Sequence, residues 1–446
     1  MSTTRSRNGT KLATLGVALA VFSAPGCYLL RESVTKAPPP APTGAAEHGL
    51  FFRVEGVAVL TLWGDPYQRG FAHGQLLAPA ILDMVDALCG TNLLLDHRRD
   101  YERVILPLVD RFEFEPDDEL ELQGVYDGVR QALGDRAVLR RIGRPLTLKD
   151  LKAYNTAGDW CRQACSSFAA WGSRTKDGHV WVGRNFDFLP AKAFFSYQML
   201  VVHRAQHGKK AWAAVTAPGM IGCVTGINED GVFTSVHDVF LPRRPVNGHY
   251  GPRLLVLRRL METCSARDLE AQALPILEAR QQMFDNAILL AAPVADGTPP
   301  ALIFEYNTDT STDRGVTVRR PQDNEPELSQ EMIACANHFR KRRKPPFALA
   351  DYRYPLLRRL LMARTREGEK LDFDAARKAM GAVRLPITVH TAVADLNTLD
   401  FWFALGEFLN PPNRHDFIKL PMKDWLSPKE EPGPPGSEKP TEVSGQ

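Results

Sequence analysis

The pattern of hydrophobic and polar positions changes at about residue 165. Before it, one alternating run at 52–62 is followed by helical spacing over 66–88 and 117–133. After it, short alternating or fully apolar runs typical of strands dominate. We predict strands at 166–171, 180–186, 198–203, 211–216, 232–236, 287–291, 301–306, 316–319, 387–393 and 401–405, and helices at 252–262, 266–273 and 354–363. This order favours two stacked sheets covered by helices.

The two N-terminal helices each carry a pair of glycines four residues apart. Gly70 and Gly74 lie on one face of the first helix, and Gly124 and Gly128 repeat the spacing on the second. Residues four apart share a helix face, so these pairs allow close approach of another element. We interpret them as packing devices rather than as a phosphate-binding loop.

The segment CSSFAAWGSRTKDGHVWVGRNFDF, residues 165–188, combines a hairpin pattern with chemically useful side chains. Asp177-Gly178 between two strand-like runs is a strong hairpin signal. A turn centred there would place Asp187 opposite Phe168, close to the level of Cys165. Regular alternation puts Arg184 and Asp187 on opposite strand faces, so both serve one site only if the strand ends or bulges between them.

A cut immediately before Cys165 would give that residue both a thiol and a free α-amine. An α-amine has a pKa of about 8 and can act as a base near neutral pH. The guanidinium of Arg184 would favour the thiolate, which is the nucleophilic form, and Asp187 could hold or orient the amine. The alternative is a buried cysteine in an ordinary hairpin.

Four segments in this order resemble the isopenicillin N acyltransferase family of N-terminal-nucleophile (Ntn) hydrolases, which is related to choloylglycine hydrolase and penicillin V acylase. They are GDPYQRGFAHGQLLA at 64–78, the hairpin at 165–188, GMIGCVTGINEDGVF at 219–233 and ANHF at 336–339. The similarity runs from about residue 54 to about residue 407. It implies an α+β fold, the αββα four-layer sandwich, preceded by a mostly helical pro-region.

The resemblance also implies a set of site residues. Cys165 would be the nucleophile, freed by self-cleavage after Ala164, with Arg184 and Asp187 as its polar partners. Asn337, in ANHF, would be an oxyanion-hole donor.

Three further positions are implied with less definite roles. Asn228 lies in the loop element, and Arg353 loosely matches a catalytic arginine. Asp238 stands where choloylglycine hydrolases have a second oxyanion asparagine. Because a carboxylate there would repel an oxyanion, either a backbone N–H serves or the alignment shifts by one residue.

The N-terminus has the layout of a secretory signal. Basic residues precede an apolar run at 12–22, and Cys27 follows small residues, which resembles a lipobox. Ordinary signal cleavage and an uncleaved anchor remain alternatives. We predict a signal peptide at 1–26, a lipid-anchored linker at 27–49, a pro-region at 50–164, an Ntn-hydrolase domain at 165–425 and a disordered tail at 426–446. The protein would be exported and held at the cell envelope.

Charge and the lack of certain motifs argue against several classes of function. The net charge of +3 gives no general reason to expect a nucleic-acid partner. The basic run at 340–344 favours a solvated loop, the alternative being attraction of an anionic substrate or membrane surface. The absence of CxxC and HExxH motifs argues against a zinc site, and we expect no metal or cofactor. A Cys161–Cys165 disulfide, which would block the nucleophile, is an open alternative.

The leading hypothesis is a self-processing cysteine amidase or acyltransferase that acts on an amide-linked acyl substrate through a thioester. Hydrolysis is favoured over transfer from acyl-CoA, since an exported enzyme would not normally meet CoA. No G-x-S-x-G elbow supports a serine hydrolase. The alternative is a non-catalytic envelope lipoprotein that uses the fold to bind a ligand.

Overall fold

The computed structural model describes residues 43–90, 97–161, 163–188, 193–206, 208–239, 248–295, 298–307, 315–324, 329–342, 352–366, 369–407, 412 and 417–427. The predicted signal peptide, the lipidation at Cys27 and nearly all of the predicted tail lie outside these residues. Within these ranges, no helix combines the length and apolar character that crossing a membrane requires.

The described strands form two large sheets. The ten-stranded sheet contains, in spatial order, β1 (Gly44–Ala46), β2 (Gly49–Val54), β3 (Val57–Leu62), β8 (Met199–His203), β9 (Trp212–Thr216), β10 (Thr225–Asn228), β11 (Phe233–Asp238), β12 (Asn286–Ala291), β13 (Ala301–Asn307) and β14 (Gly315–Arg319). The six-stranded sheet contains β15 (Met332–Cys335), β6 (Ala164–Ala170), β7 (Trp181–Asp187), β16 (Thr388–Asp395), β17 (Asp400–Leu405) and β18 (Ile418–Pro421). A small hairpin joins β4 (Val138–Leu139) to β5 (Arg144–Pro145).

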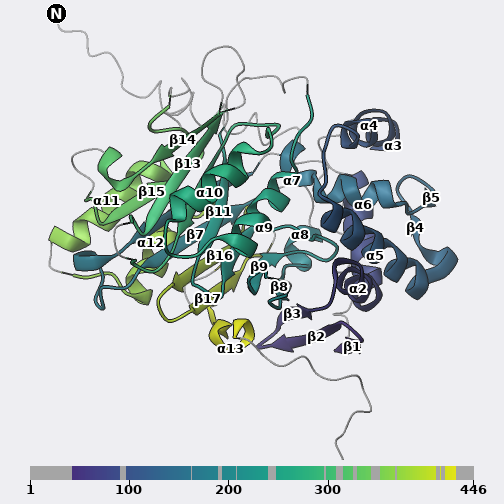
Figure 1. Ribbon diagram of the computed structural model, residues 1–446, viewed down its shortest axis with the longest axis horizontal. Helices are drawn as coiled ribbons and strands as arrows, with labels where there is room; N and C mark the ends of the chain where they lie inside the picture. The colour runs from purple at the N-terminus through teal and green to yellow at the C-terminus, as the bar shows by residue number, and fades with distance from the viewer. Residues whose placement is uncertain are drawn as a thin grey trace, which may run out of the picture.

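Helices cover the outer faces of both sheets (Figure 1). The ten-stranded sheet packs against α2 (Pro66–Cys89), α9 (Arg253–Thr263) and α10 (Leu269–Glu278), and α5 (Pro116–Leu133) and α6 (Leu148–Asn155) pack on α2. The six-stranded sheet packs against α11 (Arg353–Arg366) and α12 (Phe373–Ala382). Shorter helices are α3 (His97–Asp100), α4 (Leu106–Val109), α7 (Ala157–Trp160), α8 (Ala193–Ser196) and α13 (Met422–Leu426).

Three apolar cores separate the four layers. Between the sheets, Val182 and Ala394 of the smaller sheet share one buried cluster with Val202 and Val215 of the larger sheet. Two further clusters join each sheet to its helices, and a small fourth one consists of Phe112, Tyr250 and Met283. The α+β class and the αββα sandwich are therefore confirmed. Pattern analysis missed β10, β15 and β18, which have four residues each, and α6, which has eight. It also missed α12, although the buried residues of this helix, at 375, 376, 379 and 380, have helical spacing.

The predicted glycine packing is confirmed between α2 and α5. A Cβ atom added at Gly70 would lie 2.1 Å from the carbonyl oxygen of Glu121, and one at Gly124 would lie 2.3 Å from that of Tyr67. Real Cβ atoms do not approach backbone this closely. The two helices therefore touch backbone to backbone at these positions.

The segment before Cys165 also extends the large sheet. The single strand predicted for 52–62 is wrong, because Glu55 and Gly56 have positive φ and turn the chain into the β2–β3 hairpin. β3 then pairs in parallel with β8, with Ala58 opposite Met199. Three strands from before the predicted cut thus share a sheet with strands from after it.

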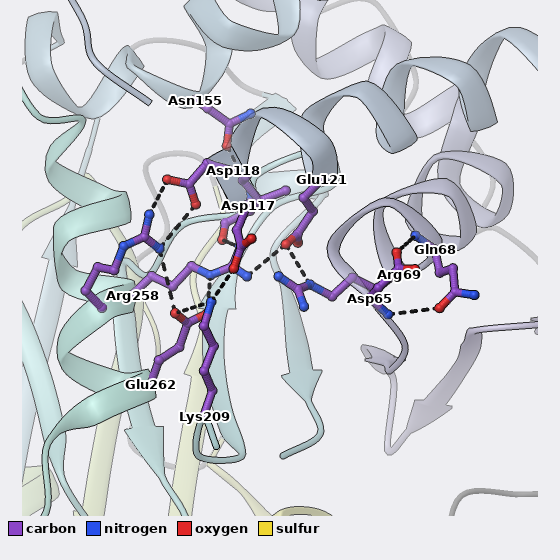
Figure 2. Close-up of polar contacts among 12 residues, drawn as sticks. Asp65, Gln68, Arg69, Asp117, Asp118, Glu121, Asn155, Lys209, Arg258 and Glu262 are labelled. Atoms are coloured by element: carbon purple, nitrogen blue, oxygen red, sulfur yellow. Dashed lines mark hydrogen bonds and ion pairs between the residues drawn. The ribbon is translucent and has the colours of Figure 1, made fainter. Parts of the chain in front are cut away.

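A buried ionic network joins the same two parts of the chain (Figure 2). Glu121 on α5 accepts hydrogen bonds from Arg69 on α2 at 2.6 Å and from Arg258 on α9 at 2.8 Å. Burial raises the pKa of Glu121, but the charges of Arg258 and Arg69 outweigh this effect and hold the pKa well below its ordinary value. Lys209 and Asp117 add a partly exposed pair at 2.7 Å. The network ties α2 and α5 to α9.

Candidate active site

The hairpin that carries Cys165 has a wider connection than the sequence predicts. β6 ends at Ala170 and β7 begins at Trp181, with a 3-10 turn at Gly172–Arg174 between them. Cys165 consequently lies opposite Phe186, and Asp187 lies opposite Ala164. The predicted pairing of Asp187 with Phe168 is wrong, because Asp177-Gly178 is only one part of a longer loop. The observed register places Asp187 beside the bond that would be cut.

The Cys165 thiol is buried and contacts a guanidinium. Arg184 Nη2 donates to Cys165 Sγ at 3.2 Å. Burial raises the pKa of the Cys165 thiol, and the charge of Arg184 opposes that rise. Arg184 is itself fully buried and also donates to the carbonyl oxygens of Val224 and Val236.

Asp187 lies on the face of the six-stranded sheet opposite that of Arg184, and it binds Arg353 of α11. Its Oδ2 accepts from Arg353 Nη1 at 2.9 Å, and its Oδ1 accepts from the Thr388 hydroxyl at 2.6 Å. Burial raises the pKa of Asp187 to about 6, with Arg353 opposing. β7 ends at Asp187, and β16 shifts register between Thr388 and His390 opposite this end. The strand end and this irregularity let side chains from both faces reach one site.

Asn337 connects the nucleophile to this ion pair. Its Oδ1 accepts from the backbone N–H of Cys165 at 2.8 Å and from Arg353 Nη2 at 2.6 Å. Its Nδ2 donates to the carbonyl oxygens of Gln163 at 3.1 Å and Asp238 at 2.7 Å. The structure thus gathers Cys165, Arg184, Asp187, Asn337 and Arg353 around the Ala164–Cys165 bond.

Asp238 contacts the segment before the nucleophile. Its Oδ2 accepts from the backbone N–H of Gln163 at 2.7 Å, and its other oxygen pairs with Arg253. The backbone N–H of Arg253 in turn binds the carboxylate of Asp159 at 3.1 Å. Burial raises the pKa of Asp159 to about 7. Sequence reasoning missed Gln163, Arg253 and Asp159, since no motif distinguishes them from ordinary helix and loop residues.

Asn228 is engaged in a different place. Its Nδ2 donates to the carbonyl oxygens of Met261 and Cys264, both at 2.9 Å, and its Oδ1 accepts from the backbone of Asp230 and Val232. These bonds fasten the β10–β11 turn to the end of α9. None of these contacts brings the Asn228 side chain to Cys165.

The Cys161–Cys165 bridge considered from the sequence is absent. Both residues are buried and form no disulfide, and the same holds for the other cysteines in the part of the chain that the structure describes. The predicted solvated loop at 340–344 is partly right, because Lys341 is exposed and Arg340 half-buried, but it is wrong for Arg342. The backbone N–H groups of Arg340, Lys341 and Arg342 bind the buried carboxylate of Glu305, and Arg342 is buried. Arg343 and Lys344 lie outside the described residues.

An apolar pocket adjoins the nucleophile. Phe186, opposite Cys165, and Val224, whose carbonyl binds Arg184, both contribute to its wall. The other lining residues are Gly158, Gln163, Phe188, Phe194, Gln198, Thr216, Ala217, Met220 and Leu254. Its free space of about 20 Å³ holds little more than one water-sized group. Residues 158 and 163 precede the predicted cut, so the uncut segment forms part of this wall.

One cluster among the described residues has ligand types suited to a metal ion. Asp177, His179 and Asp395 place one ligand atom each within 4.8 Å of one another. They lie at the loop end of the β6–β7 hairpin, opposite the end that carries Cys165. His179 Nδ1 is 2.8 Å from Asp395 Oδ2, which raises the pKa of this histidine. This geometry is explained by an ion pair.

Residues 173–346 match a family model described as acyl-coenzyme A:6-aminopenicillanic acid acyl-transferase. This confirms the resemblance to the acyltransferase family. The matched segment is less than half of the chain and contains Arg184, Asp187, Asp238 and Asn337. It supports an amidase or acyltransferase activity in general.

Individual relatives are distant. An uncharacterized protein of Archaeoglobus fulgidus is 27% identical over 194 residues, which are 40% of this chain and 32% of that protein. The match therefore spans about a third of that relative's length.

Solved structures of Ntn hydrolases are also similar. The Caenorhabditis elegans ortholog of N-acylethanolamine-hydrolyzing acid amidase has a TM-score of 0.39 at 16% identity, covering 58% of this chain and 100% of that one. A variant of conjugated bile acid hydrolase from Clostridium perfringens has a TM-score of 0.37 at 12% identity, covering 58% and 93%. Penicillin V acylase from Agrobacterium tumefaciens has 0.33 at 12%, covering 54% and 83%. We draw no conclusion about activity from likenesses at these scores.

Proposed function

We propose that this chain is a self-processing cysteine amidase that cleaves an amide-linked acyl substrate through a thioester. The observation that carries the proposal is the contact of Arg184 Nη2 with the Cys165 thiol at 3.2 Å, beside a backbone N–H bound by Asn337. A cation in contact favours the thiolate, and the buried setting strengthens that interaction. We also propose export to the cell envelope with lipid attachment at Cys27.

Self-cleavage begins at the Ala164–Cys165 bond. The sulfur of Cys165 attacks the carbonyl carbon of Ala164 as the thiol proton passes to the departing amide nitrogen, which breaks the peptide C–N bond, frees the α-amine and forms a thioester. Water then hydrolyses the thioester, releasing the carboxylate of Ala164 and restoring the thiol. Cys165 now carries a free α-amine, which would still donate to Asn337 Oδ1.

Turnover uses the same atoms on a separate substrate. The α-amine accepts the thiol proton, and the thiolate attacks the substrate carbonyl carbon. The tetrahedral oxyanion collapses as the amine nitrogen of the substrate takes the proton from the α-ammonium of Cys165 and leaves, which gives an acyl-thioester. Water completes hydrolysis by attacking that thioester. We favour water over a second amine as acceptor for an exported enzyme.

Self-cleavage separates this proposal from a ligand-binding lipoprotein with the same fold. Purified protein should give two bands on a denaturing gel, and the fragment bearing the active site should begin Cys-Ser-Ser-Phe on N-terminal sequencing. Cys165→Ala should give one uncut chain and release no acid from a panel of acyl amides. A single intact band in the parent protein, or turnover by Cys165→Ala, would refute the proposed enzyme.

A further inference from the structure

A chain of hydrogen bonds leads away from Arg184 on the side remote from the thiol. Arg184 Nη1 donates to Thr225 Oγ1 on β10 at 2.8 Å. Thr225 Oγ1 lies 2.9 Å from His390 Nε2 on β16, and His390 Nδ1 lies 2.9 Å from Gln198 Oε1. Gln198 lines the apolar pocket beside Cys165. The chain therefore links the pocket wall to the group that touches the nucleophile.

The donor and acceptor roles along this chain have one consistent direction. Gln198 Oε1 can only accept, so His390 Nδ1 carries the proton. In a neutral imidazole Nε2 then accepts, and the Thr225 hydroxyl donates to it. The hydroxyl oxygen keeps a lone pair for Arg184. Burial and the positive charge of Arg184 hold the pKa of His390 far below its ordinary value, which agrees with the neutral form.

Two aromatic rings pack close to the ring of His390. The ring lies 5.1 Å from that of Phe186 and 5.5 Å from that of Phe403, and the residue is fully buried. The nearby charge on the chain is Arg184, and the side chains that bind the ring nitrogens are neutral. A rigid, neutral acceptor is suited to orienting a hydroxyl and, through it, a guanidinium.

We propose that His390, with its proton held on Nδ1 by Gln198, is a positioning residue that aims the Arg184 guanidinium at the Cys165 thiol through Thr225. Arg184 donates from Nη1 to Thr225 and to the Val224 carbonyl, and from Nη2 to the Val236 carbonyl and the Cys165 thiol. Without the Thr225 hydroxyl held in place, the two backbone carbonyls alone orient the guanidinium, and its contact with Sγ weakens. The importance of His390 for turnover rests on the proposed function, whereas its effect on the thiol pKa does not.

The aim of Arg184 matters because other charges near the thiol act in the opposite sense. Asp187 and Asp238 both raise the pKa of the Cys165 thiol, as does burial, whereas Arg184 lowers it. Two other cations of this site are already paired, Arg253 with Asp238 and Arg353 with Asp187. If Arg184 loses contact with the thiol, no neighbouring cation among the described residues of the site is placed to lower the thiol pKa instead.

The test measures the thiol pKa in the full-length protein, whether or not it turns over substrate. The rate of iodoacetamide labelling of the Cys165 peptide is followed by mass spectrometry against pH, and ultraviolet thiolate absorbance relative to Cys165→Ser gives a second reading. His390→Phe keeps an aromatic ring but removes both hydrogen bonds. It should raise the thiol pKa by about one unit, a tenfold loss of thiolate at a given pH.

Three further variants make the result specific. His390→Gln supplies one donor and one acceptor and should recover most of the shift. Thr225→Val removes the hydroxyl at nearly constant volume and should match His390→Phe, and the double variant should add no further shift, because both act on one chain. His203→Phe is the matched control, since His203 is another buried histidine with a depressed pKa. It stacks on Trp212 on the helix-covered face of the ten-stranded sheet, whereas Thr225 lies on the face toward the other sheet.

An unchanged thiol pKa in folded His390→Phe would overturn the inference, and so would shifts that add in the double variant. An equal shift in His203→Phe would also overturn it, because it would indicate a general effect of core disruption. Failure of the proposed function has a different signature. In that case Cys165→Ala would keep any turnover, while the His390 and Thr225 shifts in thiol pKa could still be observed.

Discussion

The side-chain oxygen of Asn337 lies 2.8 Å from the backbone nitrogen of Cys165, although 172 positions separate the two residues in the chain. β15 pairs with β6 so that Cys335 lies opposite Ser167, and this register delivers Asn337 to the start of β6. Arg353 holds the same oxygen, so the amide nitrogen points toward the carbonyls of Gln163 and Asp238. The amide of Asn337 thus spans the two sides of the predicted cut.

Replacing Asn337 should slow turnover strongly. The resemblance assigns it as an oxyanion donor, and loss of one such donor typically costs about 10²–10³ in turnover. We expect Asn337→Ala to lower kcat at least tenfold in a protein that still folds, with a reduced thermal midpoint because buried groups lose their hydrogen-bond partner. Asn324→Ala is the control, because Asn324 also donates two backbone hydrogen bonds, to Ser329 and Met332, near the other end of β15. Comparable kcat values for the two variants would exclude the role.

Arg184 should set the acidity of the nucleophile. Arg184→Ala removes the charge that opposes burial, so the thiol pKa should rise by more than one unit. Arg184→Lys keeps a charge but has no planar fork to bind Thr225 and Sγ together, and should give an intermediate value. The pH profile of Cys165 alkylation measures both. A profile that stays in place while the thermal midpoint falls would reduce Arg184 to a structural residue.

The predictability of this site differs from residue to residue. Cys165, Arg184 and Asp187 could be found because they lie within one hairpin whose turn and alternation are visible locally. The strand register could not be predicted, because a longer connection replaces the two-residue turn. The cross-strand partner of Asp187 is therefore Ala164 rather than Phe168. Gln163, Arg253 and His390 could not be found either. Their roles depend on which strands become neighbours across the sandwich, and no local pattern encodes that.

In the fold, too, features set by a local pattern could be predicted, whereas features set by long-range pairing could not. Gly70 and Gly124 predicted a close helix contact because their spacing alone defines a face, and the backbones do touch there. β10 and β15 have four residues each and are buried on both sides, so they show no alternation. The contribution of β3 to the large sheet depends on a parallel pairing with β8 across more than a hundred residues. Such long-range pairings need the whole core to specify them.

Asp187 should make both stability and turnover depend on pH near 6. Its pKa is raised by burial to about 6, against about 4 in an unfolded chain. The folded state therefore retains the proton to higher pH, so the stabilisation from this group is complete below about pH 4 and is lost as the pH rises through about 6. Asp187→Asn lacks this dependence. From about pH 4 to pH 7 the unfolding free energy should shift in favour of the variant, by up to about 3 kcal/mol.

Urea unfolding of both proteins across this range measures the shift. Turnover should move in the other direction, since the ionised carboxylate is needed to hold the ammonium of Cys165. The kcat of the parent protein should rise through about pH 6, and Asp187→Asn should be slow at every pH. A constant difference in unfolding free energy would show that Asp187 titrates normally.

Glu121 should determine whether the two fragments stay together after self-cleavage. It is fully buried and compensates Arg69 on one side of the cut and Arg258 on the other. Glu121→Gln keeps the shape but leaves two buried guanidinium groups with one carboxylate fewer, and breaking a buried pair in this way typically costs about 3–5 kcal/mol. Size-exclusion chromatography of the cleaved protein should show co-elution of the fragments, persisting in the variant only at lower urea concentrations. Asp400→Asn removes the exposed partner of Lys419 and is the matched control, with an expected cost below about 1 kcal/mol. Equal urea midpoints for fragment separation in the two variants would show that the apolar core and the β3–β8 pairing hold the fragments without the ionic network.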